Sequence, residues 1–188
     1  MPAAARQANM LRKVGPLRWL CALALTFAWL IAAPLARSED LPEYRLKAAF
    51  LYNFAAFTEW PAELGPTLAI CVYGPDPFAN EIDPLNGKVA GSRRIELHRK
   101  STLESLRGCQ VVFVAAPVIG QMPRLLDTLG GLPILIVADS PGAIRQGVML
   151  NMTVVQGRVT FEANLVAARD ARLNLSSKLL RLATEVIQ

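Results

Sequence analysis

The chain has 188 residues, 53% of them hydrophobic, and a formal net charge of +5. Residues 1–38 contain five of the 20 basic residues and none of the 15 acidic residues, so the remainder of the chain is neutral. This neutrality argues against binding of nucleic acid through bulk charge, because such binding neutralises phosphates with lysine and arginine.

The first 38 residues have the pattern of a secretory signal peptide. A basic segment precedes an apolar run at residues 19–33, and the small-x-small sequence Ala36-Arg37-Ser38 follows it. We expect cleavage of residues 1–38 and export of residues 39–188 as a single domain, since this length suits one core. An uncleaved anchor is the alternative, because residues 17–35 are just long enough to span a bilayer.

The first element predicted after the leader is a helix over residues 43–59, which stops before Pro61. Between Lys47 and Glu59 its only polar side chains are Asn53 and Thr58, so the helix is apolar on nearly every face. We expect it to lie between a sheet and a second layer, either the C-terminal helix or another copy of the chain. A buried Asn53 would need hydrogen-bond partners, and we expect it to tie a loop or a helix end, with ligand binding as the alternative.

Residues 68–147 alternate between strand and helix patterns. Uninterrupted apolar runs predict buried strands over residues 68–74, 111–116 and 133–139, and an alternating pattern predicts a half-exposed strand over residues 93–99. Helices are predicted after Asp76, with Pro77 at the first helical position, and over residues 101–106, 120–131 and 140–147.

The pattern changes after residue 147. Residues 148–164 predict two strands around a Gln156-Gly157 turn, and a helix capped by Asn164 follows. Residues 173–175 then interrupt the helical pattern. Ser176 begins a last helix that has Leu179, Leu182 and Val186 on one face. One continuous helix is the alternative. Together these elements predict an α/β fold: a three-layer α/β/α sandwich with a mostly parallel sheet and an antiparallel edge hairpin.

Candidate ligand-binding groups lie at the carboxyl ends of the predicted strands, where α/β proteins bind ligands. They are Asp76, Asp139 and Ser140, which are equally typical of helix N-caps. The sequence has no Gly-rich dinucleotide fingerprint, no P-loop and no GxSxG motif, and its single histidine, His98, lies on the polar strand. We therefore predict a non-catalytic protein with no catalytic residue, no cofactor and no metal site.

Two cysteines remain once Cys21 leaves with the leader. Cys71 and Cys109 are an even number in an oxidising compartment, so we expect a disulfide between them. Two buried free thiols are the alternative.

Five stretches carry a resemblance to the YfiR family, in the order and spacing of that family. They are KAAFLYNFAAFTEWP (47–61), ICVYGPDPF (70–78), LNGKVAGSRRIEL (85–97), CQVVFVA (109–115) and FEANLVAARDARLNLSSKLLRLA (161–183). The resemblance implies a periplasmic, non-catalytic α/β/α domain. It implies that the domain binds the periplasmic part of an inner-membrane diguanylate cyclase and holds the enzyme inactive, and that an outer-membrane lipoprotein can sequester this inhibitor.

The resemblance also points to contact residues and to a redox-sensitive cysteine pair. Candidates for contact with a partner or with a second copy in a homodimer are Tyr52, Asn53, Trp60, Phe161, Glu162 and Asn164. A second cysteine pair that some family members carry is missing here, so any redox control that depends on it is not expected. The alternative function is a periplasmic receptor or adaptor that binds a small ligand and serves another membrane sensor.

Overall fold

The computed structural model describes residues 40–188, so the predicted signal peptide at residues 1–38 lies outside the described residues. The helices are α2 (Asp40–Phe57), α3 (Met122–Leu129), α4 (Leu165–Asp170) and α5 (Ser177–Leu180). Short 3₁₀ helices are η1 (Asp83–Leu85), η2 (Glu104–Gly108), η3 (Ala116–Gln121) and η4 (Ala143–Gln146). Within residues 40–188, no helix is both long enough and apolar enough to cross a membrane.

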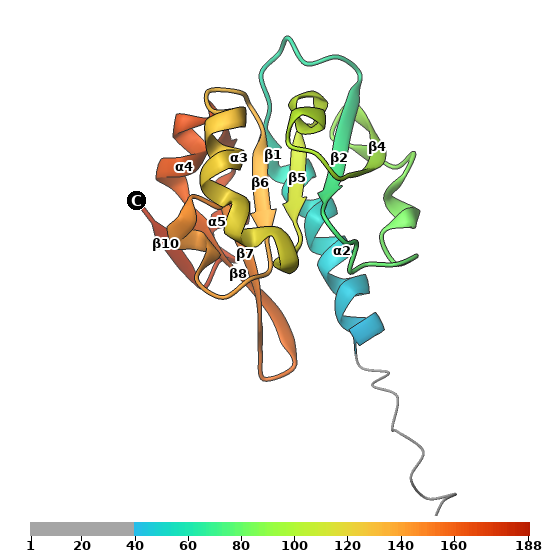
Figure 1. Cartoon of the computed structure of the whole chain (residues 1–188), viewed down its shortest axis with the longest axis vertical. Coiled ribbons are helices and arrows are strands. Elements are labelled where there is room, and N and C mark those ends of the chain that lie inside the picture. Colours follow the sequence, from blue (N-terminus) through green and yellow to red (C-terminus); the bar gives the residue numbers. More distant parts are fainter. Residues whose placement is uncertain (1–39) are drawn as a thin grey trace, which may run out of the picture. The chain divides into compact units, whose positions relative to one another are not determined.

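A mixed eight-stranded sheet forms the middle of the domain (Figure 1). Its spatial order is β10 (Glu185–Ile187), β8 (Arg158–Asn164), β7 (Leu150–Val155), β6 (Leu135–Ala138), β5 (Val111–Val114), β2 (Thr67–Tyr73), β4 (Arg93–Lys100) and β3 (Val89–Ala90). Only the β3–β4 and β7–β8 pairs are antiparallel in this sheet. The predicted α/β class with a mostly parallel sheet and an antiparallel hairpin is therefore confirmed.

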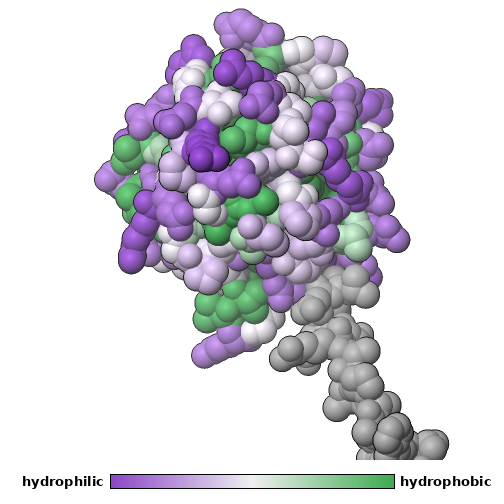
Figure 2. All heavy atoms as spheres, in the orientation of Figure 1, coloured by the Kyte–Doolittle hydropathy of each residue, from purple (hydrophilic) through white to green (hydrophobic). Residues whose placement is uncertain are grey.

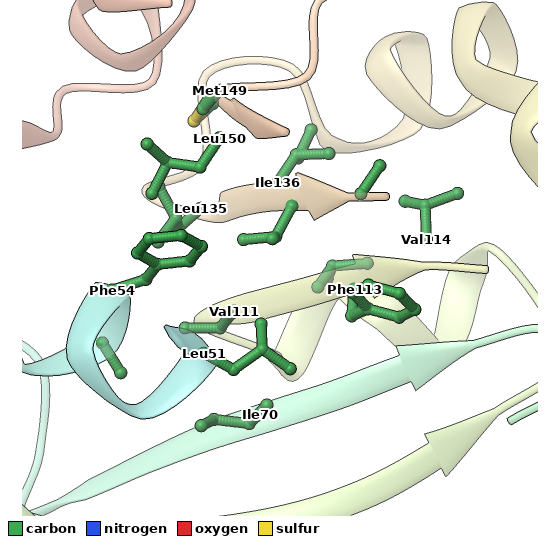
Figure 3. Close-up of a cluster of buried hydrophobic side chains, with 14 of the residues drawn as sticks. Leu51, Phe54, Ile70, Val111, Phe113, Val114, Leu135, Ile136, Met149 and Leu150 are labelled. Atoms are coloured by element: carbon green, nitrogen blue, oxygen red, sulfur yellow. The ribbon is translucent and has the colours of Figure 1, made fainter. Parts of the chain in front are cut away.

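Helix α2 packs on one face of this sheet. Leu51 and Phe54 are fully buried and point toward strand residues such as Val111 and Leu135 (Figure 3). The ring of Phe54 lies 5.0 Å from the ring of Phe161 on β8. Because α2 places its buried side chains on this face, it forms one of the two helical layers that cover the strands.

The opposite face carries α3 and α4. Successive residues of a strand point to opposite faces, so Ile136 and Met149 face away from α2. Both residues line a slot of about 200 Å³ together with Leu126 of α3 and Ala167 of α4. Helices on both faces complete the predicted three-layer arrangement.

The C-terminal segment is interrupted, as the sequence predicts. Asn164 caps α4 by accepting a hydrogen bond from the backbone N–H of Ala167 (3.0 Å), and Ser176 caps α5 in the same way through Leu179 (3.3 Å). Between them, β9 (Asn174–Leu175) pairs with β1 (Thr58–Glu59) in a separate two-stranded sheet.

Several predicted elements differ from the structure. The helices predicted over residues 101–106 and 140–147 are instead the short 3₁₀ helices η2 and η4. The first helix ends at Phe57 rather than at residue 59, because the next two residues pair as β1. No α-helix follows Pro77, since Ala79 has a left-handed backbone (φ 48°) that a right-handed helix cannot contain. The last helix ends at Leu180, and residues 185–187 form β10 beside β8, outside the hairpin.

Candidate functional site

A cleft lies near the amino ends of the central strands, and the loop that joins β1 to β2 forms part of its lining. Its volume is about 950 Å³. Four separate segments line it: Glu59–Leu64, Pro133, the end of α4 at Arg169, and residues 172–174. No single stretch of sequence carries this constellation, which explains why the sequence motifs did not reveal it.

The cleft combines apolar side chains with charges of both signs. Trp60 is half-buried, and its indole Nε1 donates a hydrogen bond to the carbonyl of Ala55 (2.9 Å), which fixes the ring at the end of α2. Arg169 and Arg172 are both exposed at the cleft, and Arg172 Nη2 donates to the carbonyl of Gly131 (2.6 Å). Glu59 and Glu63 belong to the same lining, so the cleft offers an indole and charged groups of both signs to a ligand.

The β1–β9 pair supports one side of the cleft. Asn174 Nδ2 donates to Glu59 Oε2 (2.7 Å) across the two strands. The backbone N–H of Ser176 donates to the carbonyl of Phe57 (3.1 Å), so the end of α2 and the segment between α4 and α5 are held together. Trp60 is thus the contact candidate from the sequence that the structure places in a cleft.

The carboxyl edge of the sheet, where the sequence predicts ligand-binding groups, holds a buried polar cluster. Lys47 Nζ lies 2.7 Å from Asp139 Oδ2, with side-chain exposures of 5% and 3%, and also pairs with Glu43. Tyr44 donates its hydroxyl to the same carboxylate oxygen (3.1 Å). The partners of Asp139 therefore come from α2, and the role of Asp139 and Ser140 in ligand binding stays a prediction.

The electrostatics of this cluster follow from its burial and its charges. Burial, followed by the charge of Asp139, raises the pKa of Tyr44 to about 12. Burial alone lowers the pKa of Lys47, but the hydrogen bonds to Asp139 and Glu43 outweigh it, so the pKa is raised. Lys47 is thus held as a cation that locks α2 to the end of β6.

Two oxygens of this cluster have no hydrogen-bond partner among the described residues: Asp139 Oδ1 and Ser140 Oγ. Neither Asp139 nor Ser140 lines the 950 Å³ cleft or the 200 Å³ slot. The role that the structure gives this cluster is to hold α2 against the end of β6.

Asp76, the third strand-end candidate, has a local structural role. Its Oδ1 accepts a hydrogen bond from the backbone N–H of Phe78 (2.8 Å), and its Oδ2 accepts from Arg99 Nε (2.7 Å). Arg99 also reaches Asp83 (2.8 Å) and the carbonyl of Ala79 (3.1 Å). The arginine fixes the irregular loop that replaces the predicted helix, so Asp76 is not brought to Asp139 by any described contact.

The predicted disulfide is present. Cys71 on β2 and Cys109 just before β5 are bonded, with 6.0 Å between their Cα atoms and exposures of 0% and 2%. The bond links neighbouring parallel strands and lies in the core. Among residues 40–188, no group of three or more His, Cys, Asp or Glu residues could hold a metal ion.

Two contact candidates lie on α2. Asn53 is exposed and makes no hydrogen bond to a described residue, so the expectation that it ties a loop or a helix end is wrong. Tyr52 is half-buried and donates its hydroxyl to the carbonyl of Val89 (2.9 Å). Asn53 is therefore free to meet another molecule, whereas Tyr52 is tied to β3.

The other contact candidates lie on β8. Phe161 is 1% exposed and packs on two phenylalanines of α2, so it is a core residue, and its prediction as a contact residue is wrong. Glu162 is half-buried and accepts a hydrogen bond from Asn151 Nδ2 (3.0 Å). Asn164 caps α4 and also donates to the carbonyl of Ile144 (3.2 Å).

Two solved structures share the fold. A conserved domain protein of Vibrio cholerae O1 biovar El Tor matches with a TM-score of 0.52 and 10% identity. The match covers 76% of this chain and 60% of that chain. An ABC domain of Streptococcus pneumonia in complex with L-Trp matches with a TM-score of 0.51 and 7% identity, over 77% of this chain and 60% of that chain. The chain thus spans about 60% of the length of each.

A family model identifies the chain more specifically. The model of the YfiR/HmsC-like family matches residues 44–184, which include nearly all of the described domain. The matched region contains α2 from Tyr44 onward, the disulfide and both β7 and β8. The chain therefore belongs to the YfiR/HmsC-like family.

Proposed function

We propose that this protein is a periplasmic regulator that binds the sensor domain of an inner-membrane diguanylate cyclase and holds that enzyme inactive. The observation that carries the proposal is the family match over residues 44–184. The described domain also supports a role in binding rather than in chemistry. Its buried ionic groups are paired within the fold by the Lys47–Asp139 contact, and its single histidine, His98, lies on the exposed side of β4.

Regulation of this kind requires a difference in affinity. An inhibitor that bound the active and inactive states of a cyclase equally would not change their populations, so it must favour the inactive state. Exposed apolar side chains are available for such contacts: Figure 2 shows apolar atoms at the projecting β7–β8 hairpin, where Val154 and Val155 are 45% and 53% exposed. Sequestration of the protein by an outer-membrane lipoprotein would release the cyclase by mass action.

A pull-down from detergent-solubilised membranes of the host tests this proposal. We expect the wild-type protein to retain a membrane diguanylate cyclase. The matched bait is the double variant Cys71→Ala/Cys109→Ala, which removes the disulfide without adding a reductant that would affect other proteins. Weaker retention by this bait would give the disulfide a regulatory role, whereas equal retention would make it structural. If neither bait retains a cyclase, the proposed function is wrong.

The 950 Å³ cleft favours a second candidate function, a receptor for a small ligand that serves a membrane sensor. The similar Streptococcus structure contains L-Trp, a molecule with a flat ring and a carboxylate. The same two chemical features would suit Trp60 and the pair Arg169 and Arg172 at this cleft. L-Trp is therefore the first probe to use.

Thermal unfolding in the presence of L-Trp tests the receptor function. A ligand that binds only the folded state raises the melting temperature by an amount that grows with its concentration. We expect the shift to disappear in Arg172→Gln and to persist in Arg124→Gln, a matched change on α3 outside the cleft. A shift that survives Arg172→Gln would place the site elsewhere, and no shift with wild-type protein would reject L-Trp as the ligand.

A further inference from the structure

The slot between α3, α4 and the sheet is a second cavity of the domain, and the cleft does not include it. Its volume is about 200 Å³, and its floor consists of the buried side chains of Leu129, Ile134, Ile136 and Met149. An apolar cavity of about 150 Å³ is large enough to bind benzene. The slot therefore has room for one six-membered ring or a short alkyl chain.

The slot opens to solvent on one side. Its exposed lining residues are Gly130, Gly131 and Asp170, which lie at the mouth. The two glycines carry no side chain that would close this mouth. A small molecule can therefore reach the apolar floor from solvent.

The mouth of the slot carries negative charge. Asp170 is the only ionisable residue of the lining, and it forms no ion pair with a described residue. The carboxyl end of α3, an eight-residue helix, also lies here, because Leu129 and Gly130 line the slot. A helix has a partial negative charge at its carboxyl end, so both features favour a cation.

The end of α4 separates its charges between the two cavities. Arg169 and Arg172 line the 950 Å³ cleft, whereas Asp170 lines the slot. Arg172 Nη2 donates to the carbonyl of Gly131 (2.6 Å), so this guanidinium is bound to the backbone beside the slot and not to Asp170. The carboxylate of Asp170 is therefore available to a ligand.

We propose that the slot binds a small primary amine whose apolar group is one ring or a short alkyl chain. The apolar group fills the slot against Ile136 and Met149, and the ammonium group lies at the mouth beside Asp170. An ammonium group donates three hydrogen bonds, which suits a carboxylate together with the carbonyls at the end of α3. A ligand with a carboxylate in place of the amine would meet like charge at this mouth.

Titration calorimetry with phenethylamine tests this proposal on protein expressed from the full-length sequence. A ligand of this size reaches only modest affinity, so we expect a dissociation constant on the order of 1 mM or lower. The matched probe is phenylpropanoate, which has the same ring and the opposite charge, and we expect it to bind at least about fivefold more weakly. Burial of the ring should also make the binding enthalpy more negative as the temperature rises.

Two variants locate the site. Ala167→Leu places a larger side chain in the slot and should weaken the binding of phenethylamine at least about tenfold, because the ring no longer fits. Asp170→Asn removes the charge and keeps the shape, and it should weaken binding about two- to fivefold, as expected of an exposed charge pair. Asp127→Asn is the matched control, an exposed position of α3 outside the lining, and should leave binding unchanged.

Each outcome bears on the proposal. Binding that survives Ala167→Leu in folded protein would overturn the assignment to the slot, and equal binding of phenethylamine and phenylpropanoate would overturn the preference for an amine. If Ala167→Leu does not fold, the test is an intermolecular NOE between the ring of phenethylamine and the Met149 methyl group, which the proposal requires.

Absence of phenethylamine binding by the wild-type protein would overturn the proposal as a whole. No cyclase and no L-Trp take part in these measurements, so their failure leaves both proposed functions untouched. A cyclase that is not retained in the pull-down would, in turn, leave the slot and its ligand class unaffected.

Discussion

Lys47 and Asp139 form the ion pair that fixes the first helix to the sheet. They meet at 2.7 Å, with 5% and 3% side-chain exposure, at the carboxyl end of β6. A buried pair of this kind is costly to break because the remaining charge has no compensation and cannot reach water. The position of α2 against the sheet depends on this contact.

Removal of one partner of the pair should be far worse than removal of both. We expect Lys47→Met to lower the free energy of unfolding by about 3–5 kcal/mol, because Asp139 is left buried and unpaired. The double variant Lys47→Met/Asp139→Asn should recover most of this loss. Denaturant unfolding measures both values, and Arg45→Ala is the control, since solvent screens its exposed pair with Glu81 and the change should cost far less than Lys47→Met. Equal destabilisation by the single and double variants would contradict this account of the pair.

The same cluster predicts a loss of stability at high pH. The pKa of Tyr44 is raised to about 12, whereas a tyrosine in the unfolded chain has a pKa of about 10. Between about pH 10 and about pH 12 the unfolded state therefore holds fewer protons, and the free energy of unfolding falls as the pH rises. The raised pKa of Lys47 acts in the same direction, because its contribution is complete below the unfolded pKa and is lost as the pH rises through the folded one.

Tyr44→Phe provides the measurement for this pH dependence. Its free energy of unfolding should fall less steeply than that of the wild type between about pH 9 and about pH 11, whatever its value at neutral pH. Parallel curves for the two proteins would show that Tyr44 does not titrate in the folded state as described.

At the scale of elements, the disulfide joins two neighbouring strands of the parallel sheet. Cys71 and Cys109 are 38 residues apart and close a loop that contains β4 and the short strand β3. The bond thus restricts the unfolded chain over the segment that forms β3 and β4 in the folded domain.

Loss of the disulfide should destabilise the domain without changing its fold. For a loop of this length the chain-entropy model gives about 4 kcal/mol, and we expect Cys71→Ala/Cys109→Ala to lose about that much in denaturant unfolding. Wild-type protein in reductant should unfold at the midpoint of the double variant. A double variant as stable as the oxidised wild type would show that the bond does not constrain the unfolded state.

Elements with strong local signals were predictable from the sequence, and elements fixed by distant contacts were not. The cap at Asn164 and the Gln156-Gly157 turn follow from local chemistry, and both are present. Residues 185–187 instead join β8, where the Thr184 N–H bonds the carbonyl of Phe161 (2.8 Å), and this pairing overrides the helical spacing of the leucines. The loop after Asp76 is likewise held by Arg99, a residue 23 positions away.

The candidate site also contains features that the sequence predicts and features that only distant contacts determine. The cysteine pair was predictable because export and an even count leave few alternatives, and the pairing is present. The cleft was not predictable, because its walls come from four segments that no sequence motif connects. The exposed residues of α2 could not be told from its buried ones, because the helix is apolar on nearly every side and only the packed structure separates the two sets.

At the scale of the whole molecule, the domain carries three separate surfaces on one rigid sheet. The cleft lies near the amino ends of the central strands, and the outer side of α2 exposes Leu46 and Phe57. The β7–β8 hairpin projects from the body of the domain (Figure 1). An inhibitor can use such surfaces to combine inputs, because any molecule that prefers one bound state shifts the equilibrium of the others.

The proposed function is that this protein holds a membrane diguanylate cyclase inactive. The most direct measurement is the rate of cyclic-di-GMP synthesis by host membrane vesicles whose periplasmic side is accessible, with and without added protein. We predict that synthesis falls in proportion to the protein added and that heat-unfolded protein has no effect. A rate that stays constant while the protein is shown to bind those membranes would contradict the claim.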